Sequence, residues 1–315
     1  HFGPLDERTL RAYLLQALLY GKLGELEIAN ELYQETLVIA IEQQGTNSNI
    51  VLQILDQYGR FFAELGEYEM ADVVYEKAYL ISSEALGAQD LRTIMRLQTL
   101  ANNDADLQRY ELAEQRLQDA QATLVTAVGA EALPTINILE DLAQLYQRQG
   151  KLRPALEPLE QSYALRTKVQ GPEETQTSET KERLAELYRQ LGRPDKAEPM
   201  FLEVIAASEQ LLGIADPLVI DAKSHLAQLY ENTNNFVASL RYYQEVYEID
   251  QQILGDAHPN TAGDLNNLAG IYRRLGQLQQ SEATYRQALQ AMSAALGEGA
   301  PQTISIMNNL ALVLE

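Results

Sequence analysis

The sequence predicts an all-α solenoid built from antiparallel helix pairs. Three observations support this: glycine recurs every 42 residues, a small residue recurs at the same spacing, and the residues between them show helical periodicity. The register never shifts, so no insertion separates any two copies. The glycines are Gly45, Gly87, Gly129, Gly171, Gly213, Gly255 and Gly297, and the small residues are Ala17, Gly59, Ala101, Ala143, Ala185, Ala227, Ala269 and Ala311.

One copy reads as two helices joined by a short turn. Apolar residues at spacings of three and four run through residues 265–272, and Gly276 then ends the first helix, because glycine adopts the left-handed conformation that closes helices. The second helix carries its apolar face over residues 281–289 and ends at Gly297. Prolines begin the next helix in three copies, at Pro217, Pro259 and Pro301. We therefore expect fifteen helices: seven pairs and the first helix of an eighth copy.

Two further columns predict how the helices pack. Alanine or serine recurs where the second helix crosses its partner, and aromatic residues recur on both helices. We interpret the aromatic columns as core; an aromatic ligand-binding box is the alternative. Removing Tyr146 should then cost about 3–5 kcal/mol, as for other large core aromatics. The columns are Ala29, Ala71, Ala113, Ala155, Ala197, Ser239 and Ser281; Tyr20, Phe62, Tyr146, Tyr188, Tyr230 and Tyr272; and Tyr33, Tyr75, Phe201, Tyr243 and Tyr285.

The charge and amino-acid composition disfavour several classes of partner and of chemistry. The 315 residues include 24 basic and 45 acidic side chains, a formal net charge of −21 that disfavours nucleic acid and anionic membranes. No cysteine is present, which excludes disulfides and thiolate chemistry. No apolar run reaches the roughly 18–20 residues of a membrane span. The N-terminus lacks a signal-peptide pattern and an initiator methionine, so we expect a cytoplasmic location and a longer parent protein.

The third copy departs from the pattern at two positions. Asp104 stands where other copies have tyrosine or phenylalanine, and Gln108 where five have glycine. A buried aspartate without a partner would be costly, so we expect this helix to end early and leave Asp104 in water. A flexible joint is the alternative. Asn234 replaces glycine in the sixth copy, a mild change because asparagine tolerates the same conformation.

The repeat resembles the tetratricopeptide repeat. Leu268-Ala269, Tyr272, Gly276, Ser281, Tyr285 and Ala288 follow that family's order, and the 42-residue length exceeds its usual 34. The longer form, with residues 254–259 leading into 265–269 and with Ala197-Glu198-Pro199 in the fifth copy, resembles the kinesin light chain type. The resemblance implies an all-α, right-handed superhelical solenoid of antiparallel helix pairs over residues 1–315, as a single array.

The same resemblance implies a non-enzymatic scaffold that binds a peptide or protein segment in a concave groove lined by first helices. The segment is expected to include acidic residues, and no cofactor is expected. Polar residues on an ordinary wet surface are the alternative to the groove, and a regulatory sensor segment of a larger bacterial signalling protein is the alternative to an adaptor. The implied groove residues are Asn266, Asn267, Arg273, Arg274, His225, Gln228, Arg183, Glu186, Arg189, Asp141, Gln144, Arg148, Asn308 and Asn309.

No catalytic or metal-binding motif accompanies these features. The three histidines, at 1, 225 and 258, lie far apart in the repeat order, and no phosphate-binding loop or nucleophile elbow occurs. We therefore predict no enzymatic activity. The two ends of the array expose apolar residues, which predicts self-association. Those residues are Leu14, Leu15, Leu18 and Leu19 in the first helix, and Leu310, Leu312, Val313 and Leu314 in the last.

Overall fold

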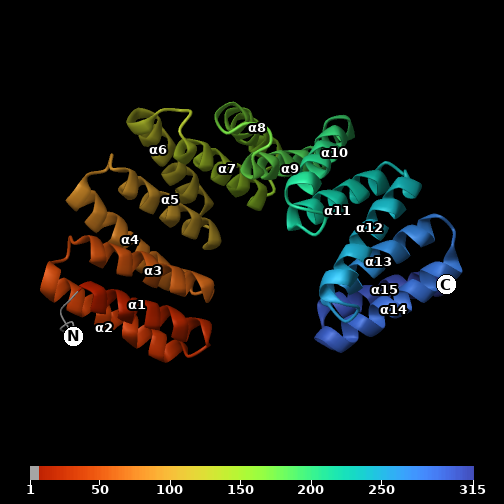
Figure 1. Ribbon diagram of the computed structural model, residues 1–315, viewed down its shortest axis with the longest axis horizontal. Helices are drawn as coiled ribbons and strands as arrows, with labels where there is room; N and C mark the ends of the chain where they lie inside the picture. Colours follow the sequence, from red (N-terminus) through yellow and green to blue (C-terminus); the bar gives the residue numbers. More distant parts are fainter. Residues whose placement is uncertain (1–6) are drawn as a thin grey trace. The chain divides into compact units, whose positions relative to one another are not determined.

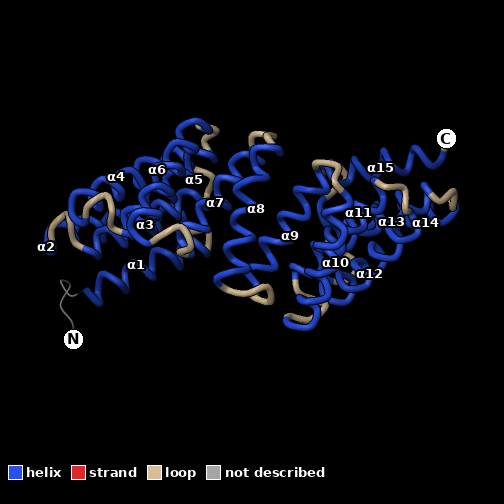
Figure 2. The backbone as a smooth tube through the Cα atoms, turned by 90° about the horizontal axis from the view of Figure 1, so that it is seen from above, coloured by secondary structure: helices blue, strands red, loops and turns tan. Residues whose placement is uncertain are grey.

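The computed structural model describes residues 7–315, and within them every regular element is an α-helix (Figures 1 and 2). The fifteen helices confirm the predicted number and the all-α class. They are α1 (Glu7–Lys22), α2 (Leu26–Gln44), α3 (Asn49–Glu64), α4 (Tyr68–Leu86), α5 (Leu91–Asp106), α6 (Tyr110–Val128), α7 (Leu133–Arg148), α8 (Leu152–Val169), α9 (Thr175–Gln190), α10 (Pro194–Leu211), α11 (Pro217–Asn232), α12 (Phe236–Leu254), α13 (Pro259–Arg274), α14 (Leu278–Leu296) and α15 (Pro301–Leu314).

The chain divides into two compact units, one ending at Ser162 and the other beginning at Tyr163, within α8. In each unit, helices pack against their neighbours in the chain: α3 against α4 and α4 against α5 in the first, α13 against α14 and α14 against α15 in the second (Figure 1). Odd-numbered helices are the first helix of a repeat and even-numbered helices the second. Stacking of this kind is the property that defines a solenoid.

The turns depend on left-handed residues. Gly276 closes α13 with φ of 75°, and Gly297 follows α14 with φ of 87°. Gln108 and Asn234, which replace glycine at the position of Gly276, take the same conformation with φ of 59° and 60°. Both copies therefore hold a residue with a side chain in a backbone conformation that favours glycine. The register of the repeat does not change at either turn.

The small residues lie where the two helices of a repeat cross. Ser281 on α14 donates a hydrogen bond from Oγ to the carbonyl oxygen of Ala269 on α13, at 2.7 Å, and both residues are fully buried. In the second copy the approach is closer still. A Cβ atom placed on Gly59 would lie 2.4 Å from the ring of Tyr75, so glycine alone fits there.

The aromatic columns divide into two classes. On second helices, Tyr33, Phe201, Tyr243 and Tyr285 are at most 3% exposed, which confirms them as core. On first helices, several rings are only half-buried. Tyr146 is one of these, and its hydroxyl donates to Glu114 at 2.8 Å.

This position corrects the expected role of Tyr146. Burial raises the pKa of Tyr146 to about 12, and the hydrogen bond and negative charge of Glu114 add to the shift. Tyr230 is placed in the same way, with its hydroxyl 2.8 Å from Glu198. Both side chains lie at the border between core and solvent, because a tyrosine can bury its ring and keep its hydroxyl on a surface acceptor.

The expectation for Asp104 is wrong. The helix α5 continues to Asp106, and Asp104 is fully buried rather than wet. Arg116 on α6 forms a hydrogen-bonded ion pair with its carboxylate, and Arg109 lies 3.6 Å away. Burial raises the pKa of Asp104, and the charge of Arg116 opposes that shift. The partner comes from a different helix, so the sequence of α5 alone does not indicate it.

The ends of the array are less apolar at the surface than the sequence suggests. Leu14 and Leu310 are buried, at 4% and 7% exposure, because each packs against the neighbouring helix. Leu15 and Leu19 on α1 and Leu312 and Leu314 on α15 are all more than half exposed. These four outward-facing leucines are the most exposed large apolar residues of α1 and α15.

Candidate functional site

The candidate residues lie on the exposed side of the first helices. In the second unit these helices are α9, α11, α13 and α15, and in the first unit the candidates lie on α7 (Figure 1). We call this side the first-helix surface. Its side chains come from fixed positions around each small anchor residue, so the 42-residue repeat brings equivalent positions to neighbouring helices.

A repeated side-chain pair joins neighbouring first helices on this surface. The first partner precedes its anchor by three residues, the second precedes the next anchor by two, and the two are therefore 43 residues apart. In each pair, the two side chains form a hydrogen bond with each other, and that donor and acceptor are then not available to a ligand. The pairs are Gln98 with Asp141 at 2.7 Å, Glu182 with His225 at 2.6 Å and Asn266 with Asn309 at 2.9 Å.

His225 lies in a polar cluster between α9 and α11. Its Nδ1 is 2.6 Å from Glu182 Oε1, and its side chain is 29% exposed. Burial alone would lower the pKa of His225, but the hydrogen bond to Glu182 and the charges of Glu182 and Glu186 raise it above the usual value. Arg189 forms two hydrogen bonds with Glu186, at 2.6 and 2.7 Å. Glu186 and Arg189 therefore form an ion pair with two hydrogen bonds.

The pKa of Glu186 shows the strength of this arrangement. Burial raises it, but the hydrogen bonds from Arg189 and Gln190 and the neighbouring His225 lower it below the usual range overall. A carboxylate held ionised in this way can accept further donors without becoming protonated. Arg183 lies on the same helix and is half-buried.

The helices α13 and α15 carry the amide-rich part of the surface. Asn267 and Arg273 are half-buried, and Arg274 and Asn308 are exposed. The Nε atom of Arg273 is buried without a hydrogen-bond acceptor in the described part of the chain. Gln228 is half-buried on α11. The exposed side chains of Arg274 and Asn308 offer guanidinium and amide donors to an external acceptor.

The candidates of the first unit lie on α7. Asp141 accepts hydrogen bonds from Gln98 and Asn102, and Arg148 pairs with Asp106 at 2.5 Å, so both link α7 to α5. Gln144 is exposed. These residues form a group of their own within the first unit.

The sequence interpretation missed an acidic pair at the edge of the surface. Asp264 on α13 and Asp250 on α12 are 9% and 6% exposed, and their carboxyl groups share a hydrogen bond. Burial raises the pKa of Asp264 to about 7, and the charge of Asp250 adds to it. The available signal was the repeat itself, since the positions equivalent to Asp264 in the neighbouring copies are Ala222 and Ile306.

The surface can provide hydrogen bonds and charge to a ligand. Among the described residues, no three histidine, aspartate or glutamate side chains are grouped so as to hold a metal ion. Likewise no described helix is long and apolar enough to cross a membrane. His258 serves locally, because its Nδ1 accepts a hydrogen bond from the Asn260 amide at the start of α13.

Comparison with protein families identifies the repeat. Tetratricopeptide repeat models match residues 52–84, 94–168, 135–210, 174–252 and 264–315, which together cover most of the chain. No curated protein sequence matches it.

Solved structures of similar fold support the same assignment. The nearly identical repeats of a proposed kinesin light chain from Podosopora anserina are 21% identical, covering 64% of this chain and 96% of that one with a TM-score of 0.58. BtubC (BKLC) from P. vanneervenii is 20% identical over 73% of this chain and 92% of its own, with a TM-score of 0.63. A STAND protein with a tetratricopeptide repeat sensor, from Pyrococcus horikoshii, is 14% identical over 98% of this chain and 50% of its own, with a TM-score of 0.62. The chain belongs to the tetratricopeptide repeat family, and the repeats of these kinesin light chain-like proteins share its fold.

Proposed function

We propose that this chain is a non-enzymatic interaction scaffold that binds an extended peptide segment on its first-helix surface, in the cytoplasm. The observation that carries the proposal is the supply of polar side chains on consecutive first helices, at a fixed register, without a catalytic or metal-ligand constellation among the described residues. An extended segment has backbone groups at regular intervals. A regular row of donors and acceptors is suited to such a ligand.

The amides of α13 and α15 are the proposed backbone contacts. Asn267 and Asn308 each offer both a donor and an acceptor, as a peptide group requires. Asn266 and Asn309 already share one hydrogen bond, which holds both side chains in a fixed orientation. A preoriented amide loses less entropy when it binds than a free one.

Arg273 and Arg274 are the proposed selectivity contacts for acidic side chains. Arg274 is exposed at the last turn of α13, and Arg273 is half-buried beside it. The molecule is otherwise strongly acidic, with a net charge of −21, so an acidic segment is repelled elsewhere. The chemistry favours a peptide with carboxylates near its α13 contact.

A binding experiment on single-site variants tests the proposal. A peptide selected from a displayed random library would be titrated against wild type, Asn267→Ala and Arg274→Ala. Each substitution should weaken binding by about 1–3 kcal/mol if the contacts are buried in the complex. Arg286→Ala is the matched control, because Arg286 is exposed on α14 of the same repeat and pairs only locally with Glu282. Equal effects of control and test variants would overturn the groove assignment.

A sensor segment of a larger signalling protein is the second candidate. It is favoured by the similarity in fold to the tetratricopeptide repeat sensor of the Pyrococcus horikoshii STAND protein, which spans 98% of this chain. The two roles differ in what ligand binding causes, not in how the ligand is held. The complete gene separates them: a fused nucleotide-binding or effector domain supports the sensor, and its absence supports the adaptor.

A further inference from the structure

The second helices of the first two repeats carry an unusual outward-facing row of side chains. We call it the outer stripe; on α4 it consists of Met70, Val73, Lys77, Leu80 and Glu84, spaced by three and four residues so that all lie on one face. Its α2 counterpart, 42 residues earlier, is Ile28, Glu31, Glu35, Val38 and Glu42. The five apolar members are between 41% and 66% exposed.

Two later repeats show what this row looks like without large apolar side chains. On α14 the same positions are Gln280, Ala283, Gln287, Gln290 and Ala294, and on α12 they are Ala238, Arg241, Glu245, Glu248 and Gln252. None of these is a large apolar residue. The repeat architecture therefore does not require apolar side chains in this row. The apolar residues of the stripe on α2 and α4 are not explained by the fold of the repeat.

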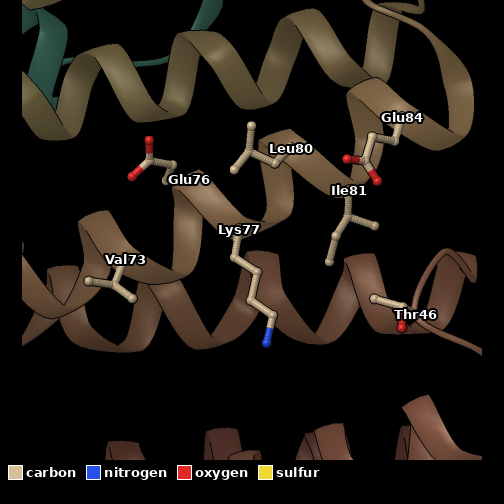
Figure 3. Close-up of a pocket in the computed structure, with 7 residues that line it drawn as sticks. All are labelled: Thr46, Val73, Glu76, Lys77, Leu80, Ile81 and Glu84. Carbon is tan, nitrogen blue, oxygen red and sulfur yellow. The ribbon is translucent and has the colours of Figure 1, made fainter.

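A shallow pocket lies on the α4 part of the stripe. It has a volume of about 390 Å³ and is lined by Val73, Glu76, Lys77, Leu80, Ile81 and Glu84, with Thr46 from the loop that follows α2. In Figure 3, Val73, Lys77 and Ile81 extend from the edge of α4 nearest Thr46, whereas Glu76 and Leu80 project from the other edge. The pocket can receive an apolar side chain between charged neighbours.

The charge around the stripe is negative. Its ten positions include four glutamates and one lysine, all exposed, and Glu27 and Glu69 lie next to it at the starts of the two helices. The glutamates of the stripe form no ion pair in the described chain. Apolar surface bordered by unpaired carboxylates is complementary to apolar surface bordered by lysine or arginine.

We propose that the outer stripe of α2 and α4 is a docking surface for a basic amphipathic helix of a partner protein. The side chains of the stripe form ridges at three- and four-residue spacing, and such ridges pack into the grooves of another helix. A second copy of this chain is a poor occupant, because its net charge of −21 repels the same acidic row. Anionic lipid is disfavoured for the same reason.

A pair of designed peptides tests the proposal. The probe is a helical peptide of about 18 residues, or five turns, with leucines at spacings of three and four and lysines elsewhere; its partner has glutamate in place of lysine. Fluorescence anisotropy measures binding to wild type, to V73E/L80E and to A283E/Q290E. The last is the matched control, since Ala283 and Gln290 are the exposed α14 counterparts of Val73 and Leu80 and both variants add two negative charges. Circular dichroism checks that all three proteins are equally helical.

The expected result is specific to one variant and one peptide. The lysine peptide should bind wild type, and V73E/L80E should weaken it about tenfold or more, whereas A283E/Q290E should change it less than about twofold. Hydrogen exchange should show protection of α2 and α4. The glutamate peptide should not bind. E31Q/E35Q should weaken the lysine peptide and reduce its salt dependence.

Any one of several outcomes would overturn the proposal. These are equal weakening by the two glutamate-adding variants, protection confined to other helices, an unchanged salt dependence in E31Q/E35Q, and a dimer in sedimentation experiments that V73E/L80E dissociates. The last outcome would assign the stripe to self-association. Binding of wild type to phosphatidylserine vesicles that V73E/L80E abolishes would assign it to a membrane surface and would also overturn the proposal.

Discussion

Asn309 on α15 donates a hydrogen bond to Asn266 on α13, with 2.9 Å between Nδ2 and Oδ1. The two residues are 43 positions apart, one more than the repeat length. Glu182 and His225 are related in the same way in the same unit. The offset of one arises because the partner on the next helix comes from the adjacent position, so the same contact recurs wherever the two side chains are complementary.

The Asn266–Asn309 bond should stabilise the packing of α15 on α13. A double-mutant cycle with Asn266→Ala and Asn309→Ala, measured by urea unfolding, should give a coupling energy of about 0.5–1.5 kcal/mol, as for a neutral hydrogen bond. Both side chains are half-buried, which makes the lower half of this range the expected result. Additive single substitutions would show that the bond contributes nothing in solution.

Arg116 should matter more to stability than Asp104, although the two form one ion pair. Arg116→Ala leaves a fully buried carboxylate without its direct partner and should cost about 3–5 kcal/mol. Asp104→Ala should cost less, about 1–3 kcal/mol, because the Arg116 side chain is 20% exposed and can turn to water. Thermal unfolding of the two variants provides the comparison. The reverse order would mean that Asp104 is protonated or hydrated in the native state.

Asp264 should make the protein less stable as the pH rises. Its pKa is about 7 in the folded state against about 3.9 when unfolded, so the folded state binds the proton more tightly between these values. Stability should therefore fall from about pH 4 to pH 7 and then level off, by about 2–4 kcal/mol in this interval.

The variant Asp264→Asn isolates this contribution. This variant should lack the decrease in unfolding free energy with pH that Asp264 causes, and it should be more stable than wild type at pH 8. His225, whose pKa is also raised, gives a loss of stability with the same sign as the pH rises, but it is present in both proteins and cancels in the difference. Urea unfolding at several pH values measures that difference. A difference that does not vary with pH would contradict the assignment.

Tyr285 should contribute more to stability than Tyr146. Tyr285 is 2% exposed, so Tyr285→Ala should cost about 3–5 kcal/mol. Tyr146 is half-buried, and Tyr146→Ala should cost about 1–3 kcal/mol. Tyr146→Phe separates the hydroxyl, whose bond to Glu114 is expected to contribute about 0.5–1.5 kcal/mol. Equal costs for the two alanine variants, measured by chemical unfolding, would contradict the division of aromatics into two classes.

Self-association through the chain ends stays a prediction, now limited to fewer residues. Leu312 and Leu314 are 54% and 57% exposed on α15, and Leu15 and Leu19 are 65% and 56% exposed on α1. Replacing Leu312 and Leu314 with glutamate should reduce the association of the 315-residue chain in a light-scattering concentration series. A wild-type chain that is monomeric at the highest concentration would refute the prediction.

The sequence by itself determined the repeat, the helices and much of the core. A constant spacing of 42 residues fixes which residues are equivalent, and glycine or asparagine at the turns can be recognised without coordinates because few residues accept a positive φ. The crossing points follow for the same reason, as at Gly59, where no larger side chain fits. These features depend on local conformation and on a period, and both are visible in a single chain.

Tertiary structure decided which polar side chains satisfy one another. Asp104 forms an ion pair with Arg116 on the next helix, and Asn266 accepts a hydrogen bond from Asn309 on the next first helix. Asp264 lies beside Asp250, and its pKa is raised. The sequence shows these residues as departures from a column or as members of a wet face. Whether a charge is neutralised, shared or protonated depends on distances of a few ångströms between helices, and on how much water remains there, neither of which is encoded in the spacing of the repeat.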